Sequence, residues 1–133
     1  MTRALLLIPA LVLAVDVAGA AAGHPWTPGL LTIDPESAQR LLHAGERLAF
    51  VDLRPADAYR AGRLPGARSV PLAELRSRHA EIPRDALVVV YGAASTGEAG
   101  AAWRFLRSVG VPRAFVLEGG LAAWRAGGFT IED

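Results

Sequence analysis

The sequence predicts a single small α/β domain with a mainly parallel central sheet flanked by helices on both faces. Strand-like and helix-like segments alternate from residue 30 to the end of the chain. The strongest strand signal, Leu87–Tyr91, is continuously apolar, which is typical of a strand covered on both faces. The chain has 133 residues and 52% hydrophobic side chains, which is enough for one core and excludes intrinsic disorder as the main state.

In the first half of the domain, a short strand at residues 30–33 is expected to lead into a helix. Asp34-Pro35-Glu36 supplies an N-cap, a proline at the first helical position and an acidic first turn, and Gly45 ends that helix. The remaining expected elements of this half are a buried strand at 48–53, a short helix at 55–61 closed by Gly62, a turn at 64–66, an extended segment at 69–72 and a second short helix at 73–79.

The second half of the domain begins with the strand Leu87–Tyr91 and a loop of small residues, 92–97. The next helix presents a packed face with the spacing i, i+3, i+4, i+7, formed by Ala102, Phe105, Leu106 and Val109, and it ends at Gly110. A buried strand at Ala114–Leu117, a sharp turn at Gly119-Gly120, a short helix at 121–125 and a strand-like segment at 129–131 complete the chain.

The first 22 residues are typical of a secretory signal peptide. Arg3 gives a positive start, residues 4–15 form an apolar run that is short for a membrane span, and small residues at 18–23 fit a cleavage site. Asp16 and Pro9 argue against the alternative of an uncleaved membrane anchor. We therefore expect a periplasmic or secreted protein with a Pro-rich linker at 23–29 and a domain at 30–133, touching the membrane only through the signal peptide before cleavage.

Composition excludes several kinds of chemistry. The net charge of +1 gives no indication of a nucleic-acid partner, and all 14 basic residues are arginine, so a lysine Schiff base is excluded. The sequence contains no cysteine, which excludes a disulfide, a thiolate metal site and a thiol nucleophile. His24, His43 and His79 are widely spaced, as surface histidines usually are, so we expect neither a metal site nor a cofactor.

Three stretches in the right order resemble the signatures of the rhodanese-like family, small α/β domains built around a sulfur-carrying cysteine. They are Val51-Asp52-Leu53-Arg54-Pro55 with Tyr59; Gly62-Arg63-Leu64-Pro65-Gly66-Ala67-Arg68-Ser69-Val70-Pro71, with Arg63 in place of the usual histidine; and Val116-Leu117-Glu118-Gly119-Gly120-Leu121-Ala122-Ala123-Trp124. The resemblance covers nearly all of the expected mature chain. The same residues also have structural roles, because Pro65 and Gly66 suit a tight turn and Trp124 and Tyr59 suit a core.

The resemblance implies a cysteine directly after the central strand, at the start of a loop that leads to a helix N-terminus. Gly92 occupies that position here, so the sequence favours a protein with no catalysis of its own. The residues of this candidate ligand-binding loop are Gly92, Ala93, Ala94, Ser95, Thr96 and Gly97. Ser95 and Thr96 are weak replacements for a thiol, because an alcohol needs an adjacent base. The favoured interpretation of Ser95 is a capping box with Glu98.

Asp52, Arg54 and Arg63 follow neighbouring strands and are expected on the rim of a pocket beside this loop. Backbone donors and arginines together suit a small oxyanion or an acidic or modified segment of a partner protein. Two observations oppose anion binding here. The Glu98 carboxylate can itself interact with the positive end of the helix dipole, and Arg54 can instead pair with Asp52 or Asp57.

Three functions therefore stay open. The leading interpretation is a non-catalytic anion- or protein-binding or regulatory module. The alternatives are a sulfurtransferase-type protein that relies on a partner's thiol, and a structural accessory domain without a ligand.

Overall fold

The computed structural model describes residues 29–133, and residues 32–133 form one compact unit. The expected signal peptide lies outside the described residues, as does all of the expected linker except Gly29. No helix within residues 29–133 is both long enough and apolar enough to cross a membrane.

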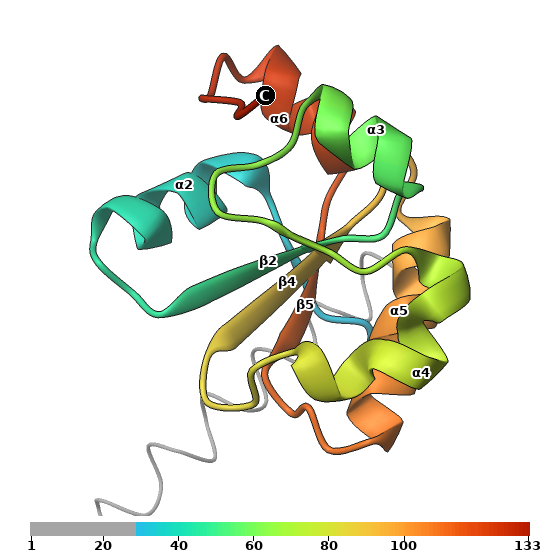
Figure 1. The fold of residues 1–133 in the computed structure, drawn as a ribbon. Coiled ribbons are helices and arrows are strands. Elements are labelled where there is room, and N and C mark those ends of the chain that lie inside the picture. Colours follow the sequence, from blue (N-terminus) through green and yellow to red (C-terminus); the bar gives the residue numbers. More distant parts are fainter. Residues whose placement is uncertain (1–28) are drawn as a thin grey trace, which may run out of the picture. The chain divides into compact units, whose positions relative to one another are not determined.

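A five-stranded parallel sheet forms the centre of the domain (Figure 1). Its strands are β1 Thr32–Ile33, β2 Leu48–Asp52, β3 Arg68–Ser69, β4 Leu87–Tyr91 and β5 Ala114–Leu117, in the order β1-β5-β4-β2-β3. Each pair is parallel, and β4 lies at the centre between β2 and β5. Val88, Val89 and Val90 are fully buried, which confirms the interpretation of this apolar run as a strand covered on both faces.

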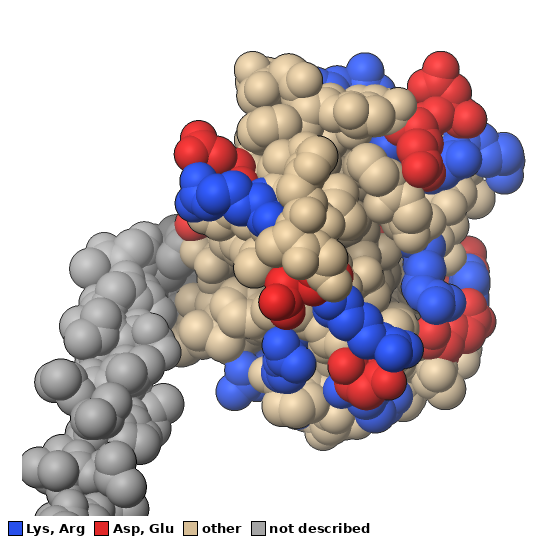
Figure 2. Space-filling view, turned by 90° about the vertical axis from the view of Figure 1, so that its left-hand side faces the viewer, with Lys and Arg blue, Asp and Glu red and all other residues tan. Residues whose placement is uncertain are grey.

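Helices connect successive strands and lie on both sides of the sheet (Figure 1). They are α2 Pro35–His43, α3 Ala56–Ala61, the 3₁₀ turn η1 Leu72–Glu74, α4 Leu75–Arg78, the 3₁₀ turn η2 His79–Glu81, α5 Gly97–Ser108 and α6 Gly120–Ala126. On one face, Phe50 and Val89 pack with Ala38 of α2 and Trp124 of α6. Helices α4 and α5 lie on the opposite face. On the side of the molecule seen in Figure 2, basic and acidic side chains lie interspersed among other residues. The predicted α/β fold with a covered parallel sheet is therefore confirmed.

The expected boundaries of α2 are confirmed in atomic detail. The Asp34 carboxylate accepts a hydrogen bond from the Ser37 N–H at 2.7 Å, and Pro35 occupies the first helical position. Gly45 follows the helix with φ +80°, a conformation that favours glycine. Hydrogen bonds from the backbone and side chain of Ser37 lower the pKa of Asp34, which keeps this cap ionised.

The prediction of a capping box between Ser95 and Glu98 at the start of α5 is wrong. Thr96 is the N-cap and its side chain makes no capping hydrogen bond, while the Ser95 hydroxyl accepts from the Gly97 N–H at 3.1 Å. The helix begins one residue later than a Ser95 cap requires. Glu98 is therefore its second residue, where its side chain is not placed to complete the box.

Two other local expectations also need correction. Residues 129–131 are not a strand; the chain end makes an isolated antiparallel bridge between Glu132 and Arg63. The expected extended segment at 69–72 is shorter, because β3 ends at Ser69 and a 3₁₀ turn begins at Leu72. The single helix expected at 73–79 is divided among η1, α4 and η2.

Candidate functional site

The loop between β4 and α5 begins with Gly92, directly after Tyr91 at the carboxyl end of the central strand. Gly92 is buried, and the next three residues are exposed. A Cβ atom built on Gly92 would meet the Ser95 carbonyl oxygen at 4.0 Å as its nearest neighbour, an ordinary contact. The position therefore has room for a side chain, and its glycine is not explained by crowding around the Cβ.

Helix α6 holds this loop in place through the loop's carbonyl groups. The Leu121 N–H donates to the Gly92 oxygen at 2.9 Å, and the Ala122 N–H donates to the Ala93 oxygen at 2.8 Å. Gly120 has φ +57°, and a Cβ there would come within 2.4 Å of the Gly92 oxygen. The close approach of the two backbones thus requires glycine at 120, which agrees with the predicted sharp turn at Gly119-Gly120.

The N–H groups of the same loop are available to a ligand. Within the described residues, no hydrogen bond is donated by the backbone N–H of residues 93–96. These groups precede the N-terminus of the twelve-residue helix α5, where backbone donors and the helix dipole favour negative charge. The backbone of the loop can therefore receive an anionic group without help from an arginine.

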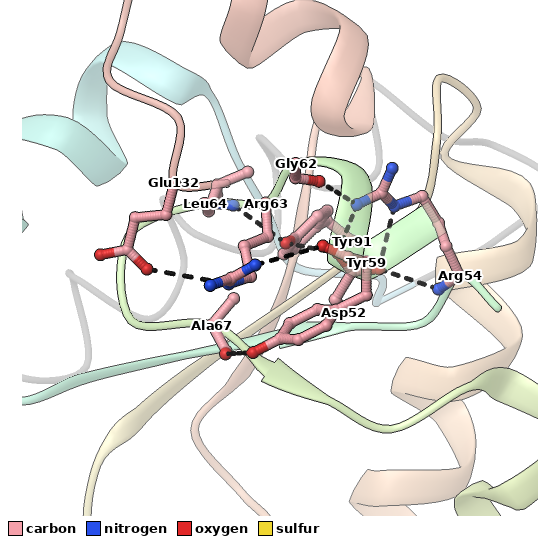
Figure 3. A network of polar contacts seen from close by, with 9 residues as sticks. All are labelled: Asp52, Arg54, Tyr59, Gly62, Arg63, Leu64, Ala67, Tyr91 and Glu132. Carbon is pink, nitrogen blue, oxygen red and sulfur yellow. Dashed lines mark hydrogen bonds and ion pairs between the residues drawn. The ribbon is translucent and has the colours of Figure 1, made fainter. Parts of the chain in front are cut away.

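Asp52 and Arg54, two of the expected rim residues, bind each other (Figure 3). The Asp52 carboxylate is fully buried and accepts from Arg54 Nε at 3.0 Å and Nη2 at 2.7 Å. Arg54 Nη2 also donates to the Gly62 carbonyl at 2.6 Å. This confirms the alternative in which Arg54 pairs with Asp52.

Tyr91 extends this pair into the core. Its hydroxyl donates to Asp52 Oδ2 at 2.7 Å and accepts from the Leu64 N–H at 3.2 Å (Figure 3). Burial, followed by the charge of Asp52, raises the pKa of the Tyr91 phenol far above its ordinary value. The hydrogen bonds to Asp52 likewise raise the pKa of Arg54. The network therefore joins an ion pair to a phenol that keeps its proton.

Arg63, the third rim residue, is directed toward the end of the chain. Its guanidinium lies 4.8 Å from the centre of the Tyr59 ring, and its Nε is 3.9 Å from Glu132 Oε1 (Figure 3). Its backbone exchanges two hydrogen bonds with Glu132, at 2.9 and 2.8 Å. Both rim arginines thus have partners within the domain, and ligand binding by their side chains stays a prediction.

A cavity of about 530 Å³ lies next to the first turn of α5, which directly follows the loop, but neither residues 92–97 nor the three expected rim residues line it. Most of its lining residues are apolar and come from the segments that follow β2 and β3: Leu53, Pro55, Ala56, Pro71, Leu72 and Ala73. Its charged lining residues are Glu74 and Glu98. The cavity therefore suits an apolar group better than a free oxyanion.

Neither histidine of the described residues contacts Ser95 or Thr96. His43 contacts Gln39 on α2, and the ring of His79 packs edge-on against Phe105. Residues 29–133 contain no cluster of three metal-ligating side chains. Serine catalysis and a metal centre therefore have no geometric support in the described part of the chain.

A sequence model of the rhodanese-like domain matches residues 34–127, most of the described chain. The chain belongs to the rhodanese-like domain family. The resemblance stated from the three motifs is thereby confirmed. This rhodanese-like domain carries glycine at the position where the resemblance implies cysteine. Its sequence contains no thiol at all.

Similar proteins include enzymes and regulators. An HTH-type transcriptional regulator of Mycobacterium tuberculosis, Rv0324, is 37% identical over 121 residues, which cover 89% of this chain and 51% of the relative. A sulfurtransferase of Allochromatium vinosum is 33% identical over 99 residues, which cover 74% of this chain and 92% of the relative. The solution structure of a rhodanese-like domain from Anabaena has 31% identity and a TM-score of 0.69. The match covers 76% of this chain and 77% of the Anabaena domain. The chain thus spans about half the length of the mycobacterial regulator.

Proposed function

We propose that this rhodanese-like domain is a non-catalytic binding module. The observation that carries the proposal is Gly92 at the start of the loop, in a sequence without a single cysteine. A persulfide cannot form on this chain, because no sulfur nucleophile is present to carry it. The scaffold otherwise keeps its loop, which is tied to α6 by two hydrogen bonds.

The geometry favours a segment of a partner protein over a free oxyanion as the ligand. Arg54 and Arg63 are engaged with Asp52, Tyr59 and Glu132, so neither guanidinium is a free anion receptor. The neighbouring cavity is mainly apolar. The N–H groups of residues 93–96 are the remaining donors for an anionic group on that partner.

A second candidate is a sulfurtransferase-type protein in which a partner supplies the thiol. The space at the Cβ position of Gly92 is the feature that supports it, because a partner's thiol would have to occupy the place of the missing cysteine side chain. The relative from A. vinosum is named a sulfurtransferase. In this reading the domain holds the partner's cysteine and contributes only the backbone donors of the loop.

A thiosulfate:cyanide assay tests the proposal. Purified protein should produce thiocyanate no faster than the uncatalysed reaction, and clear turnover would overturn a non-catalytic role. Adding glutathione as a thiol donor tests the second candidate: turnover above that of glutathione alone would favour it.

Gly92→Cys tests whether the scaffold has lost only its nucleophile. Because the Cβ has room, the variant should fold, and the loop donors should lower the pKa of the new thiol. The matched control is Ala126→Cys, an exposed thiol at the end of α6. Thiosulfate turnover by the first variant and not the second would show that the loop is still competent. No turnover by either would mean that the loop serves binding alone.

We further propose that the protein is periplasmic or secreted after cleavage of residues 1–22. The apolar run and small residues of that segment support this location. N-terminal sequencing of protein from the periplasm or medium should begin near residues 21–23. Protein that starts at Met1 and stays in the cytoplasmic fraction would overturn the proposal.

A further inference from the structure

A shallow trough separates η1 and α4 from α5, which lie next to each other in Figure 1. It consists of the 530 Å³ cavity next to the first turn of α5 and a second hollow of about 260 Å³. Leu72 lines both, so the two are adjacent. The second hollow extends from Leu72 to Phe105, away from the loop. We call the combined depression the α4–α5 trough.

The α5 wall of the trough follows a single face of the helix. Glu98, Ala101, Ala102 and Phe105 line it, with the spacing i, i+3, i+4, i+7 that places residues on one side. The two alanines have the smallest side chains of the four, so the floor stays open between the carboxylate and the ring. From Glu98 to Phe105 the helix rises about 10 Å.

The two ends of the α4–α5 trough carry opposite charges that have no ion-pair partner within the described residues. Glu98 is exposed at the loop end. Arg76 is exposed at the other end, and its guanidinium lies 5.2 Å from the centre of the Phe105 ring. Glu74 lines the same hollow as Glu98 and shares Arg78 with Glu81, at 2.8 and 2.9 Å, so it adds to the negative charge of that end.

We infer that the α4–α5 trough binds an extended segment of a partner protein in which two or three apolar residues separate a basic residue from an acidic one. The basic residue pairs with Glu98, and the acidic residue pairs with Arg76. An extended chain rises about 3.3 Å per residue, so two charged residues with two or three others between them lie about 10–13 Å apart, close to the distance along α5. The inference rests on the proposed binding function and specifies the chemistry of the partner.

Selection from a phage library of random heptapeptides on the immobilised protein tests the inference. The enriched peptides should share a basic and an acidic residue separated by two or three apolar positions. A synthetic peptide of that consensus, labelled with fluorescein, should bind in a fluorescence polarisation assay. No enrichment, or a consensus without the two charges, would overturn the inference.

Variants locate the binding. Ala101→Phe fills the floor of the trough with an exposed side chain and should reduce binding at least tenfold, whereas Ala126→Phe on α6 should not. Glu98→Gln should weaken binding about two- to fivefold, as expected for one exposed ion pair, and Glu46→Gln in the distant α2–β2 loop should leave it unchanged. Binding that survives Ala101→Phe would overturn the inference.

Two further outcomes are distinguishable. A concentration-dependent dimer in size-exclusion chromatography that disappears in Ala101→Phe would mean that a second copy of the chain occupies the trough, which would overturn the assignment of the occupant. Thiosulfate turnover by the wild-type protein would overturn the non-catalytic function, whereas absent peptide binding with no turnover would overturn only the trough.

Discussion

The Asp52 carboxylate lies fully buried against the guanidinium of Arg54, with two hydrogen bonds of 3.0 and 2.7 Å between the side chains. A charge in this position is tolerated because two further donors bind it: the Arg54 backbone N–H and the Tyr91 hydroxyl. The pair therefore joins the end of β2 to the end of β4 and, through Gly62, to the segment after α3.

Arg54→Ala should be strongly destabilising. It leaves the buried Asp52 carboxylate without its counter-charge, which costs on the order of 3–5 kcal/mol. Urea unfolding followed by circular dichroism measures the change. The control is Arg47→Ala, whose pair with Asp85 is about 70% exposed on both side chains and should contribute no more than about 1 kcal/mol. Equal losses in the two variants would contradict the structural role of Arg54.

The stability of the domain should fall above about pH 10 because of Tyr91. In the unfolded chain this phenol loses its proton near its ordinary pKa of 10.0, whereas burial keeps it protonated in the folded state. The folded protein then holds more protons than the unfolded one, so the free energy of unfolding decreases as pH rises through this range. Below about pH 10 the phenol is protonated in both states, and the stabilisation that comes from Tyr91 is fully present. Urea midpoints measured between pH 8 and 11 give the profile.

Tyr91→Phe is the control for that profile. The variant should be less stable at neutral pH by about 1–3 kcal/mol, because the Leu64 N–H loses its acceptor and Asp52 loses a donor. Its urea midpoint should decline less steeply above pH 10 than that of the wild type. An equally steep decline would mean that groups other than Tyr91 cause the loss of stability at alkaline pH.

Gly120→Ala should cost considerably more than Gly128→Ala. Both glycines have positive φ, +57° and +76°, so alanine is strained at either position by about 1–2 kcal/mol. At Gly120 the new Cβ would also come within 2.4 Å of the Gly92 oxygen, whereas at Gly128 nothing lies within 4 Å. The difference between the two unfolding free energies isolates the contact between α6 and the loop. Equal costs would show that this contact relaxes freely.

Asp34→Ala should lower stability by about 1 kcal/mol, because it removes the side-chain acceptor at the start of α2. Asp34→Asn keeps an acceptor and should be nearly neutral at pH 7. Because the folded-state pKa of Asp34 is lowered, its contribution is present above its ordinary pKa of 3.8 and is lost as the pH falls below that value. Thermal unfolding at pH 7 and pH 3 measures both effects; a loss at Asp34 that persists unchanged at pH 3 would argue against the cap.

Local chemistry made much of the fold predictable. The Asp34-Pro35-Glu36 start of α2 and the apolar run of β4 each depend on neighbouring residues and have one dominant conformation. Gly119-Gly120 was also predictable as a turn. Trp124 was predictable as a core residue, and its full burial confirms this. The position of Gly92 followed from its place directly after the strand.

The parts that sequence reasoning missed depend on partners distant in the chain. Asp52 and Asp57 lie two and three residues from Arg54 in the sequence, and only the fold selects Asp52. Nothing local indicated that Glu132 bridges to Arg63 rather than extending a strand. The start of α5 differs by a single residue from the expected cap, a shift that propensities do not resolve. The cavity beside Glu98 arises from three separate segments.

The order of the strands has a consequence for synthesis on the ribosome. The first strand, β1, pairs with the last, β5, and with no other strand within residues 29–133. At about 5–20 residues per second, several seconds pass between the translation of these two segments. Helix α6, which fixes the carbonyl groups at Gly92 and Ala93, is made later still. The nascent chain therefore reaches the geometry of its binding loop only after α6 has been translated, and a chain that terminates before Gly120 lacks both hydrogen bonds.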